Sequence, residues 1–86
     1  MDYVIAVFIN RAQSQMFSKI LFRYRVNNQI VSTPRELGVS CGLSVKFNIV
    51  NLKQAKIALN SGSYSSFKNF YKIVPLSSNK YTYIKV

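Results

Sequence analysis

The run of apolar residues from Tyr3 to Ile9 (YVIAVFI) constrains the fold of this chain more than any other feature. It is rich in β-branched side chains and does not alternate with polar residues, which is typical of a strand buried on both faces. Such a strand belongs in the centre of a sheet. The chain has 86 residues, enough for one domain and too few for two, so we expect a single domain over residues 1–86.

Two later segments show the apolar periodicity of an amphipathic helix. The first runs from Asn10 to Val26, with Asn10 and Gln13 as its predicted N-cap and capping-box pair. The second follows Asn51 with the same Asn-x-x-Gln pattern, and Gly62 is well placed to end it.

Four shorter segments have the composition or alternation of strands: Gln29–Thr33, Leu43–Phe47, Phe70–Val74 and Tyr81–Val86. Pro34 and Pro75 are expected to end two of them. The element order is then β-α-β-β-α-β with an extra C-terminal strand that pairs back on its predecessor. This order predicts an α+β fold of the ferredoxin-like split β-α-β type.

The charge of the chain is strongly positive. Twelve Lys and Arg stand against two acidic residues, a formal net charge of +10, and no acid follows residue 44. This balance favours anionic partners such as nucleic acid or an acidic protein surface. The alternative explanation is a bias in base composition, which the abundance of Lys, Asn, Ile and Tyr favours.

Arg11, in the first turn of the first helix, is expected on the same rim of the sheet as the loop over residues 34–42.

Several kinds of active site are excluded by residue type. The chain has no histidine, its only carboxylates are Asp2 and Glu36, and its only cysteine is Cys41. The chain therefore lacks the residues for a histidine-based triad, for a pair of catalytic carboxylates, and for a zinc or iron–sulfur site within one chain. It also has no Gly-rich phosphate loop. We expect neither an enzyme nor a metal or cofactor site.

The cellular location of the protein is predicted from its apolar stretches and its cysteine content. No stretch approaches the ~18 apolar residues of a membrane helix, and the apolar run at the N-terminus lacks a basic leader and a cleavage site. A lone cysteine forms no internal disulfide, which fits a reducing compartment. We expect a cytoplasmic protein without a membrane partner.

The segment Thr33–Gly42 (TPRELGVSCG) contains the only cysteine. Gly42 allows close backbone approach, and its amide together with Arg35 would favour a Cys41 thiolate. On position alone, however, Cys41 is better explained as a small buried hydrophobe at the start of a strand. Arg35 likewise has the alternative of a solvated charge or a partner for Glu36.

The residues Thr33-Pro34-Arg35-Glu36-Leu37 and Ser40-Cys41-Gly42-Leu43 resemble the selenium/sulfur carrier-protein-like family of small bacterial domains. The resemblance runs over nearly the whole chain. It implies a carrier with a persulfide or perselenide on Cys41, with sulfur or selenium donor and acceptor proteins as partners. On electrostatic grounds, Arg35 and the Gly42 amide would then stabilise the anion.

Two other functions stay open at this point. A basic nucleic-acid-binding module is suggested by the charge, with Tyr71, Tyr81 and Tyr83 as a platform for bases, although packing in the core or hairpin is the expected role of these rings. The strand LSVKF lacks the Gly/aromatic motif of ferredoxin-like RNA binders. The third function is a non-catalytic ligand- or subunit-interaction domain, such as a homodimer, which rests on fold analogy alone.

Overall fold

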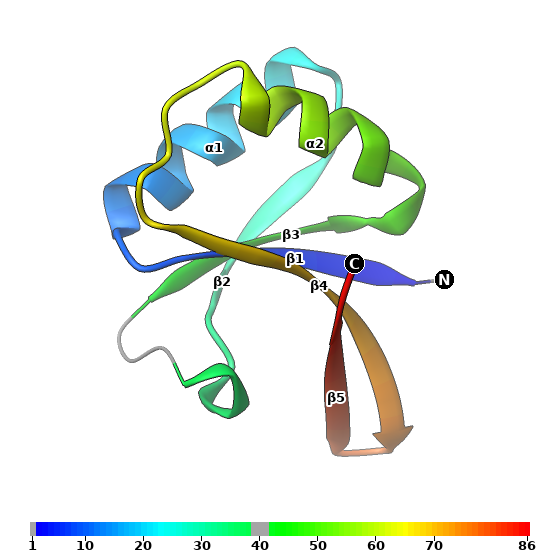
Figure 1. Cartoon of the computed structure of the whole chain (residues 1–86). Coiled ribbons are helices and arrows are strands. Elements are labelled where there is room, and N and C mark those ends of the chain that lie inside the picture. The colour runs from blue at the N-terminus through cyan, green and yellow to red at the C-terminus, as the bar shows by residue number, and fades with distance from the viewer. Residues whose placement is uncertain (1, 39–41) are drawn as a thin grey trace.

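The computed structural model describes residues 2–38 and 42–86. The elements follow in the order β1 (Tyr3–Phe8), α1 (Arg11–Arg23), β2 (Asn28–Ser32), the 3₁₀ turn η1 (Arg35–Leu37), β3 (Leu43–Asn48), the 3₁₀ turn η2 (Ile49–Asn51), α2 (Leu52–Asn60), β4 (Phe67–Ser77) and β5 (Lys80–Lys85) (Figure 1). The predicted α+β class is confirmed, because the described residues form two helices and an antiparallel sheet of five strands.

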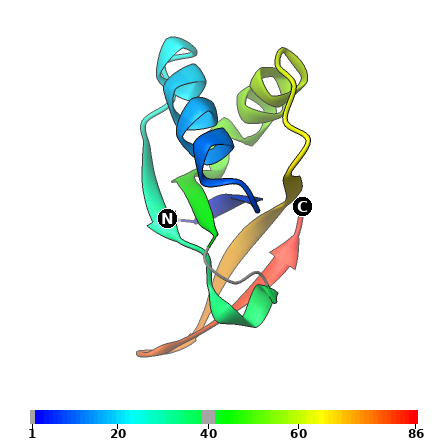
Figure 2. The same ribbon diagram turned by 90° about the vertical axis from the view of Figure 1, so that its left-hand side faces the viewer.

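The sheet has the strand order β2-β3-β1-β4-β5, and each neighbouring pair is antiparallel. Helix α1 connects β1 to β2, which lie on either side of β3. Helix α2 connects β3 to β4, which lie on either side of β1. Both helices cover the same face of the sheet, while η1 and the β4–β5 hairpin lie on the other side (Figures 1 and 2). We call that other side the open face.

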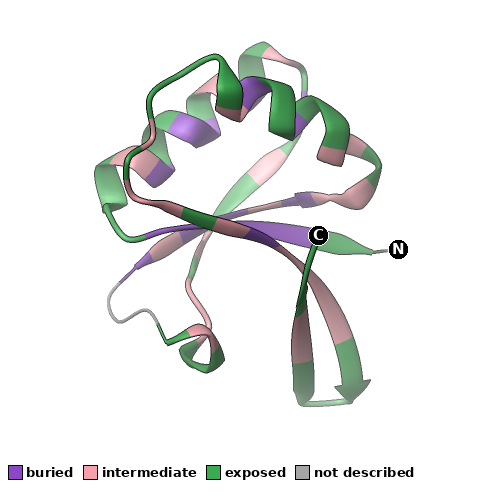
Figure 3. Ribbon diagram, in the orientation of Figure 1, coloured by how far each residue is buried: buried purple, intermediate pink, exposed green. Residues whose placement is uncertain are grey.

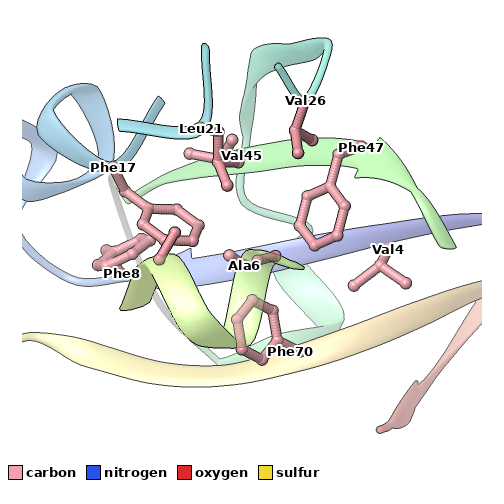
Figure 4. Packing of buried hydrophobic residues seen from close by; sticks show 11 residues of the cluster. Val4, Ala6, Phe8, Phe17, Leu21, Val26, Val45, Phe47 and Phe70 are labelled. Carbon is pink, nitrogen blue, oxygen red and sulfur yellow. The ribbon is translucent and has the colours of Figure 1, made fainter. Parts of the chain in front are cut away.

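Strand β1 lies at the centre of the sheet and is buried on both faces, as predicted. Val4, Ala6 and Phe8 point toward the helices and belong to the main hydrophobic cluster (Figure 4). Ile5 and Val7 lie on the open face and are nevertheless 1% and 0% exposed. From Val4, the burial along β1 is continuous to its end at Phe8, one residue before the predicted end (Figure 3).

Helix α1 begins at Arg11 with the predicted N-cap. Asn10 Oδ1 accepts hydrogen bonds from the backbone N–H groups of Ala12 and Gln13 at 2.8 and 3.2 Å. The predicted return bond from Gln13 to Asn10 is wrong. Gln13 Oε1 instead accepts bonds from the N–H and the hydroxyl of Ser66, at 2.9 and 2.7 Å. This side chain therefore joins α1 to the chain just before β4.

Helix α1 ends at Arg23, earlier than predicted, in a Schellman motif. The N–H of Val26 donates to the carbonyl of Leu21 at 2.9 Å, and the N–H of Arg25 donates to the carbonyl of Phe22 at 3.0 Å. Arg25 has a φ of 60°, the left-handed conformation that glycine usually takes at this position. The turn leaves the Arg25 side chain exposed at the surface.

Helix α2 is capped differently from the prediction. Asn51 makes no capping bond with its side chain, and Asn48 Oδ1 instead accepts a bond from the N–H of Val50 at 3.0 Å, at the start of η2. The helix ends at Asn60, shortly before Gly62 as expected. Neither α1 nor α2, the helices of the described residues, has the length and apolarity that a membrane crossing requires.

Strand β4 is longer than predicted, because Pro75 does not end it. The pairing of β4 with β1 stops at Ile73, so the outer part of β4 has β5 as a neighbour on one side only. A proline, which has no N–H to donate, is tolerated in such a one-sided stretch. The register shift between Pro75 and Ser77 accommodates it further.

Candidate functional site

The segment Thr33–Gly42 connects β2 to β3 at one end of the sheet. Its first part forms η1, in which the N–H of Leu37 donates to the carbonyl of Pro34 at 3.2 Å. Gly38 follows with a φ of 70°, and its N–H donates to the carbonyl of Arg35 at 3.0 Å. Other side chains adopt this backbone conformation with strain, so the turn favours glycine. The sequence predicted a loop here and gave no sign of the 3₁₀ turn.

The two ends of the segment are joined by hydrogen bonds at its base. The N–H of Thr33 donates to the carbonyl of Gly42 at 3.1 Å, and the hydroxyls of Thr33 and Ser44 are hydrogen-bonded at 2.8 Å. Gly42 is buried, and Ser44 is 0% exposed. The base of the segment therefore continues the β2–β3 ladder and is held firmly on both strands.

Cys41, the predicted carrier residue, lies outside the described residues, as do Val39 and Ser40. The structure does describe Gly42, the next residue in the chain, whose carbonyl is bonded to Thr33. The roles expected of Cys41 and of the Gly42 amide therefore stay predictions.

Arg35 lies on η1 with its side chain exposed. The pairing of Arg35 with Glu36 that the sequence left open is not observed, since the salt bridge of the described residues joins Lys72 to Asp2 at 3.6 Å. The Arg35 guanidinium thus forms no salt bridge with a carboxylate within the described part of the chain. Its role toward a bound anion stays a prediction.

The first turn of α1 lies at the same end of the sheet as the segment Thr33–Gly42 (Figure 1). Ser14, which is fully buried, donates its hydroxyl to the carbonyl of Leu43 at 2.6 Å and so ties α1 to the first residue of β3. Arg11 belongs to this first turn and is exposed. The N-terminus of a helix is the positive end of its dipole, so both features favour an anion at this end of the sheet.

A groove of about 550 Å³ crosses the open face beside the segment. All five strands contribute to it, and its lining is mainly aromatic and aliphatic with one basic side chain: Tyr3, Pro34, Lys46, Ile73, Tyr81 and Tyr83 are among its residues. Pro34 belongs to the segment Thr33–Gly42, so the groove adjoins the predicted carrier site. We call this the aromatic groove.

The pairing register explains why these side chains gather. Tyr3 lies directly opposite Ile73, and Ile73 lies directly opposite Tyr83, so the three form a row across β1, β4 and β5. Lys46 Nζ lies 4.6 Å from the centre of the Tyr3 ring, a cation–π contact. Tyr83 was predicted from the sequence as part of an aromatic platform, whereas Tyr3 and Lys46 were not. Alternation along their strands places both on the open face, but the local sequence does not give the register.

The pKa of Tyr83 is raised above its ordinary value of 10.0. Burial is the first cause, the negative charge of Glu36 the second and Tyr81 the third. Glu36 on η1 therefore lies close enough to β5 to act on a side chain of the aromatic groove.

Replacing Glu36 by glutamine is expected to lower the pKa of Tyr83, because the Glu36 carboxylate disfavours the phenolate. A folded-state pKa above 10.0 means that folding favours the neutral phenol. This contribution to stability is therefore complete below pH 10.0 and is lost as the pH rises through the folded pKa. Titration of ¹³C-labelled tyrosines by NMR, with Tyr83→Phe for assignment, measures the shift. An unchanged Tyr83 titration would contradict the proximity of η1 and β5.

A comparison with protein families identifies the relatives of this chain. The family model described as "Putative Se/S carrier protein-like" matches residues 2–72. The chain belongs to this family. The resemblance inferred from the Thr33–Gly42 segment is thereby confirmed. No curated protein and no solved structure matches the chain. The match to the Se/S carrier-like family contains the whole segment and ends within β4, so that Tyr81 and Tyr83 lie outside it.

Proposed function

We propose that this chain is a sulfur or selenium carrier that holds a persulfide or perselenide on Cys41. The observation that carries the proposal is membership of the Se/S carrier-like family, since the matched residues contain the segment Thr33–Gly42. Cys41 is the only cysteine, so it is the only thiol on which this chain can form a persulfide.

The surroundings of the segment support an anionic sulfur group. Arg35 is exposed on η1, and Arg11 and the N-terminus of α1 lie at the same end of the sheet. Cations and helix N-termini stabilise thiolates relative to thiols. In this proposal Arg35 and the Gly42 amide stabilise the sulfur anion of Cys41.

The chemistry of loading and unloading is an exchange between S–S bonds. The Cys41 thiolate attacks the outer sulfur of a donor persulfide, a new S–S bond forms, and the donor leaves as a thiolate. An acceptor thiolate then attacks the outer sulfur on Cys41, which leaves as a thiolate in turn. The number of S–S bonds is conserved at each step, so the transfer requires no added oxidant or reductant.

The proposed role is that of a carrier between a donor protein and an acceptor protein, not that of an enzyme with its own turnover. The chain contains no histidine and only two carboxylates. Asp2 pairs with Lys72, and Glu36 lies near Tyr83. In this proposal, general acid–base catalysis is supplied by the donor or acceptor protein.

We also infer that the fold is of the ferredoxin-like type. Two features support this inference: each helix crosses over one intervening strand, and four of the strands have the order β4-β1-β3-β2. Strand β5 then extends the sheet beyond the β4 edge.

The proposal is tested by loading the wild-type protein with glutathione persulfide. Intact-mass spectrometry is expected to show the gain of one sulfur atom, which dithiothreitol removes and cyanide releases as thiocyanate. Prior alkylation of Cys41 with iodoacetamide is the control and should prevent the gain. If Cys41 reacts readily with iodoacetamide but gains no sulfur from the persulfide, the carrier function is contradicted.

A further inference from the structure

We propose that the open face of the sheet binds single-stranded nucleic acid, with bases stacked on the tyrosines and phosphates bound by basic side chains. This function does not depend on Cys41. It also draws on β5, which lies outside the part of the chain matched by the Se/S carrier-like family.

Two hollows on the protein surface adjoin each other and differ in chemistry. The first is the aromatic groove. The second has a volume of about 400 Å³ and is lined largely by amide and basic side chains, among them Arg25, Asn27 and Gln29. Tyr3 and Lys46 line both hollows, so the two form one continuous surface. We call the second hollow the basic pocket. A surface with an aromatic part and a cationic part matches a ligand that carries both bases and phosphates.

The aromatic part presents tyrosine rings on a rigid sheet. Tyr3 and Tyr81 are 36% and 47% exposed, so their rings are accessible on the open face. Tyr83 lies in the row Tyr3–Ile73–Tyr83, two strands away from Tyr3. Because neighbouring strands of a sheet are about 4.8 Å apart, the backbones of β1 and β5 are expected about 10 Å apart, so that each tyrosine can stack on a different base of one strand. Single-stranded nucleic acids bind proteins by stacking of this kind.

The cationic part is complementary to phosphate. Arg25 is exposed at the left-handed turn after α1, and Lys46 stands at the junction of the two hollows. No carboxylate lines either hollow in the described residues. Glu36 acts on Tyr83, in the part of the aromatic groove away from Arg25, and Asp2, which precedes Tyr3, is paired with Lys72. The phosphates that the protein contacts are therefore expected near Arg25, and the bases that stack on its side chains are expected near Tyr83.

The charge and the aromatic side chains together favour nucleic acid over other occupants. A second copy of this chain would bring a further net charge of +10 against the same face, and such like charges repel. An acidic peptide satisfies the basic side chains, but its carboxylates offer no flat ring to stack on Tyr81 and Tyr83. A single strand satisfies both parts of the surface.

The test is a fluorescence anisotropy titration with a fluorescein-labelled single-stranded RNA of about 12 nucleotides. Binding is expected at low salt and should weaken as salt rises, with a log–log slope of about −0.7 for each phosphate contacted. Lys46→Gln should reduce the size of this slope by about 0.7, whereas Lys56→Gln on the exposed side of α2 makes the same charge change and should leave it nearly unaltered.

The stacking contribution has its own matched pair of variants. Tyr81→Leu should weaken binding about 5- to 150-fold, the loss expected when one stacked base loses its aromatic partner. Phe22→Leu removes an exposed ring from α1, 55% exposed, and should leave the affinity unchanged. Tyr81 and Phe22 both lie at the surface, so both variants are expected to fold.

Four results would overturn the proposal: absence of binding at low salt, equal losses in Lys46→Gln and Lys56→Gln, equal affinity for an RNA duplex of the same length, or displacement of the RNA by oligoglutamate at equal charge concentration. The last would identify an acidic polypeptide as the ligand. Cys41→Ser should bind the RNA like the wild type, so a failure of RNA binding and a failure of sulfur loading are distinguishable.

Discussion

Replacing Cys41 by serine is expected to abolish sulfur loading completely. A serine hydroxyl is not ionised at neutral pH and does not form a persulfide, while its size is close to that of the thiol. The sequence contains no second cysteine that could take over. Intact-mass spectra after incubation with glutathione persulfide should therefore show the gain of a sulfur atom in the wild type and an unchanged mass in the variant.

A matched control for this substitution lies one residue earlier in the chain. Ser40→Ala changes the same segment and leaves the thiol in place, so it should load sulfur like the wild type. Both proteins should retain the thermal stability of the wild type. A Cys41→Ser protein that still gains one sulfur atom would contradict the assignment of the carrier residue, because the sulfur would then be held on another group.

The sequence predicted the element types well because each rests on a local period. The apolar run of β1 identifies a strand buried on both faces. In β3, Val45 and Phe47 alternate with Ser44 and Lys46, and the first pair is buried in the core against the helices. Periods of two and of about 3.6 residues are enough to separate strands from helices. The α+β class follows from their order along the chain.

The errors arose where a distant part of the chain decides the outcome. The side chain of Gln13 bonds to Ser66, 53 residues away, and not to the backbone of Asn10. Pro75 was expected to end β4, but the strand continues because β1 no longer flanks it there. Asn48 and Asn51 both suit a helix N-terminus, and the local pattern does not distinguish them. These are choices made by tertiary contacts.

In the candidate site, too, the parts that depend on local sequence could be predicted and the parts that depend on tertiary structure could not. The Thr33–Gly42 segment could be found from its residues, because its Pro-Arg-Glu-Leu and Cys-Gly groups resemble a family that also matches the chain. The aromatic groove could not, because it depends on the register that places Tyr3, Ile73 and Tyr83 in one row. The position of Arg25 could not be predicted either, since an arginine in the left-handed conformation at a helix end has no sequence signature.

Replacing Phe8 by alanine is expected to lower the free energy of unfolding by about 3–5 kcal/mol. Phe8 is 0% exposed, and its ring contacts those of Phe17, Tyr64 and Phe67 at centroid distances of 5.4, 5.7 and 5.4 Å. The variant loses the buried ring and its edge-to-face contacts and leaves a cavity between β1 and α1. In a domain of this size, this corresponds to a fall in Tm of roughly 12–40 °C.

The control for Phe8→Ala is Phe22→Ala, which makes the same chemical change where the ring is 55% exposed. It should alter stability by no more than about 0.5 kcal/mol. Thermal and urea unfolding followed by circular dichroism measure both variants, and equal losses would contradict the core described for this fold. Phe8 lines neither the aromatic groove nor the basic pocket. At low temperature, therefore, the folded fraction of Phe8→Ala should bind RNA like the wild type, which separates the stability of the sheet from the function of its open face.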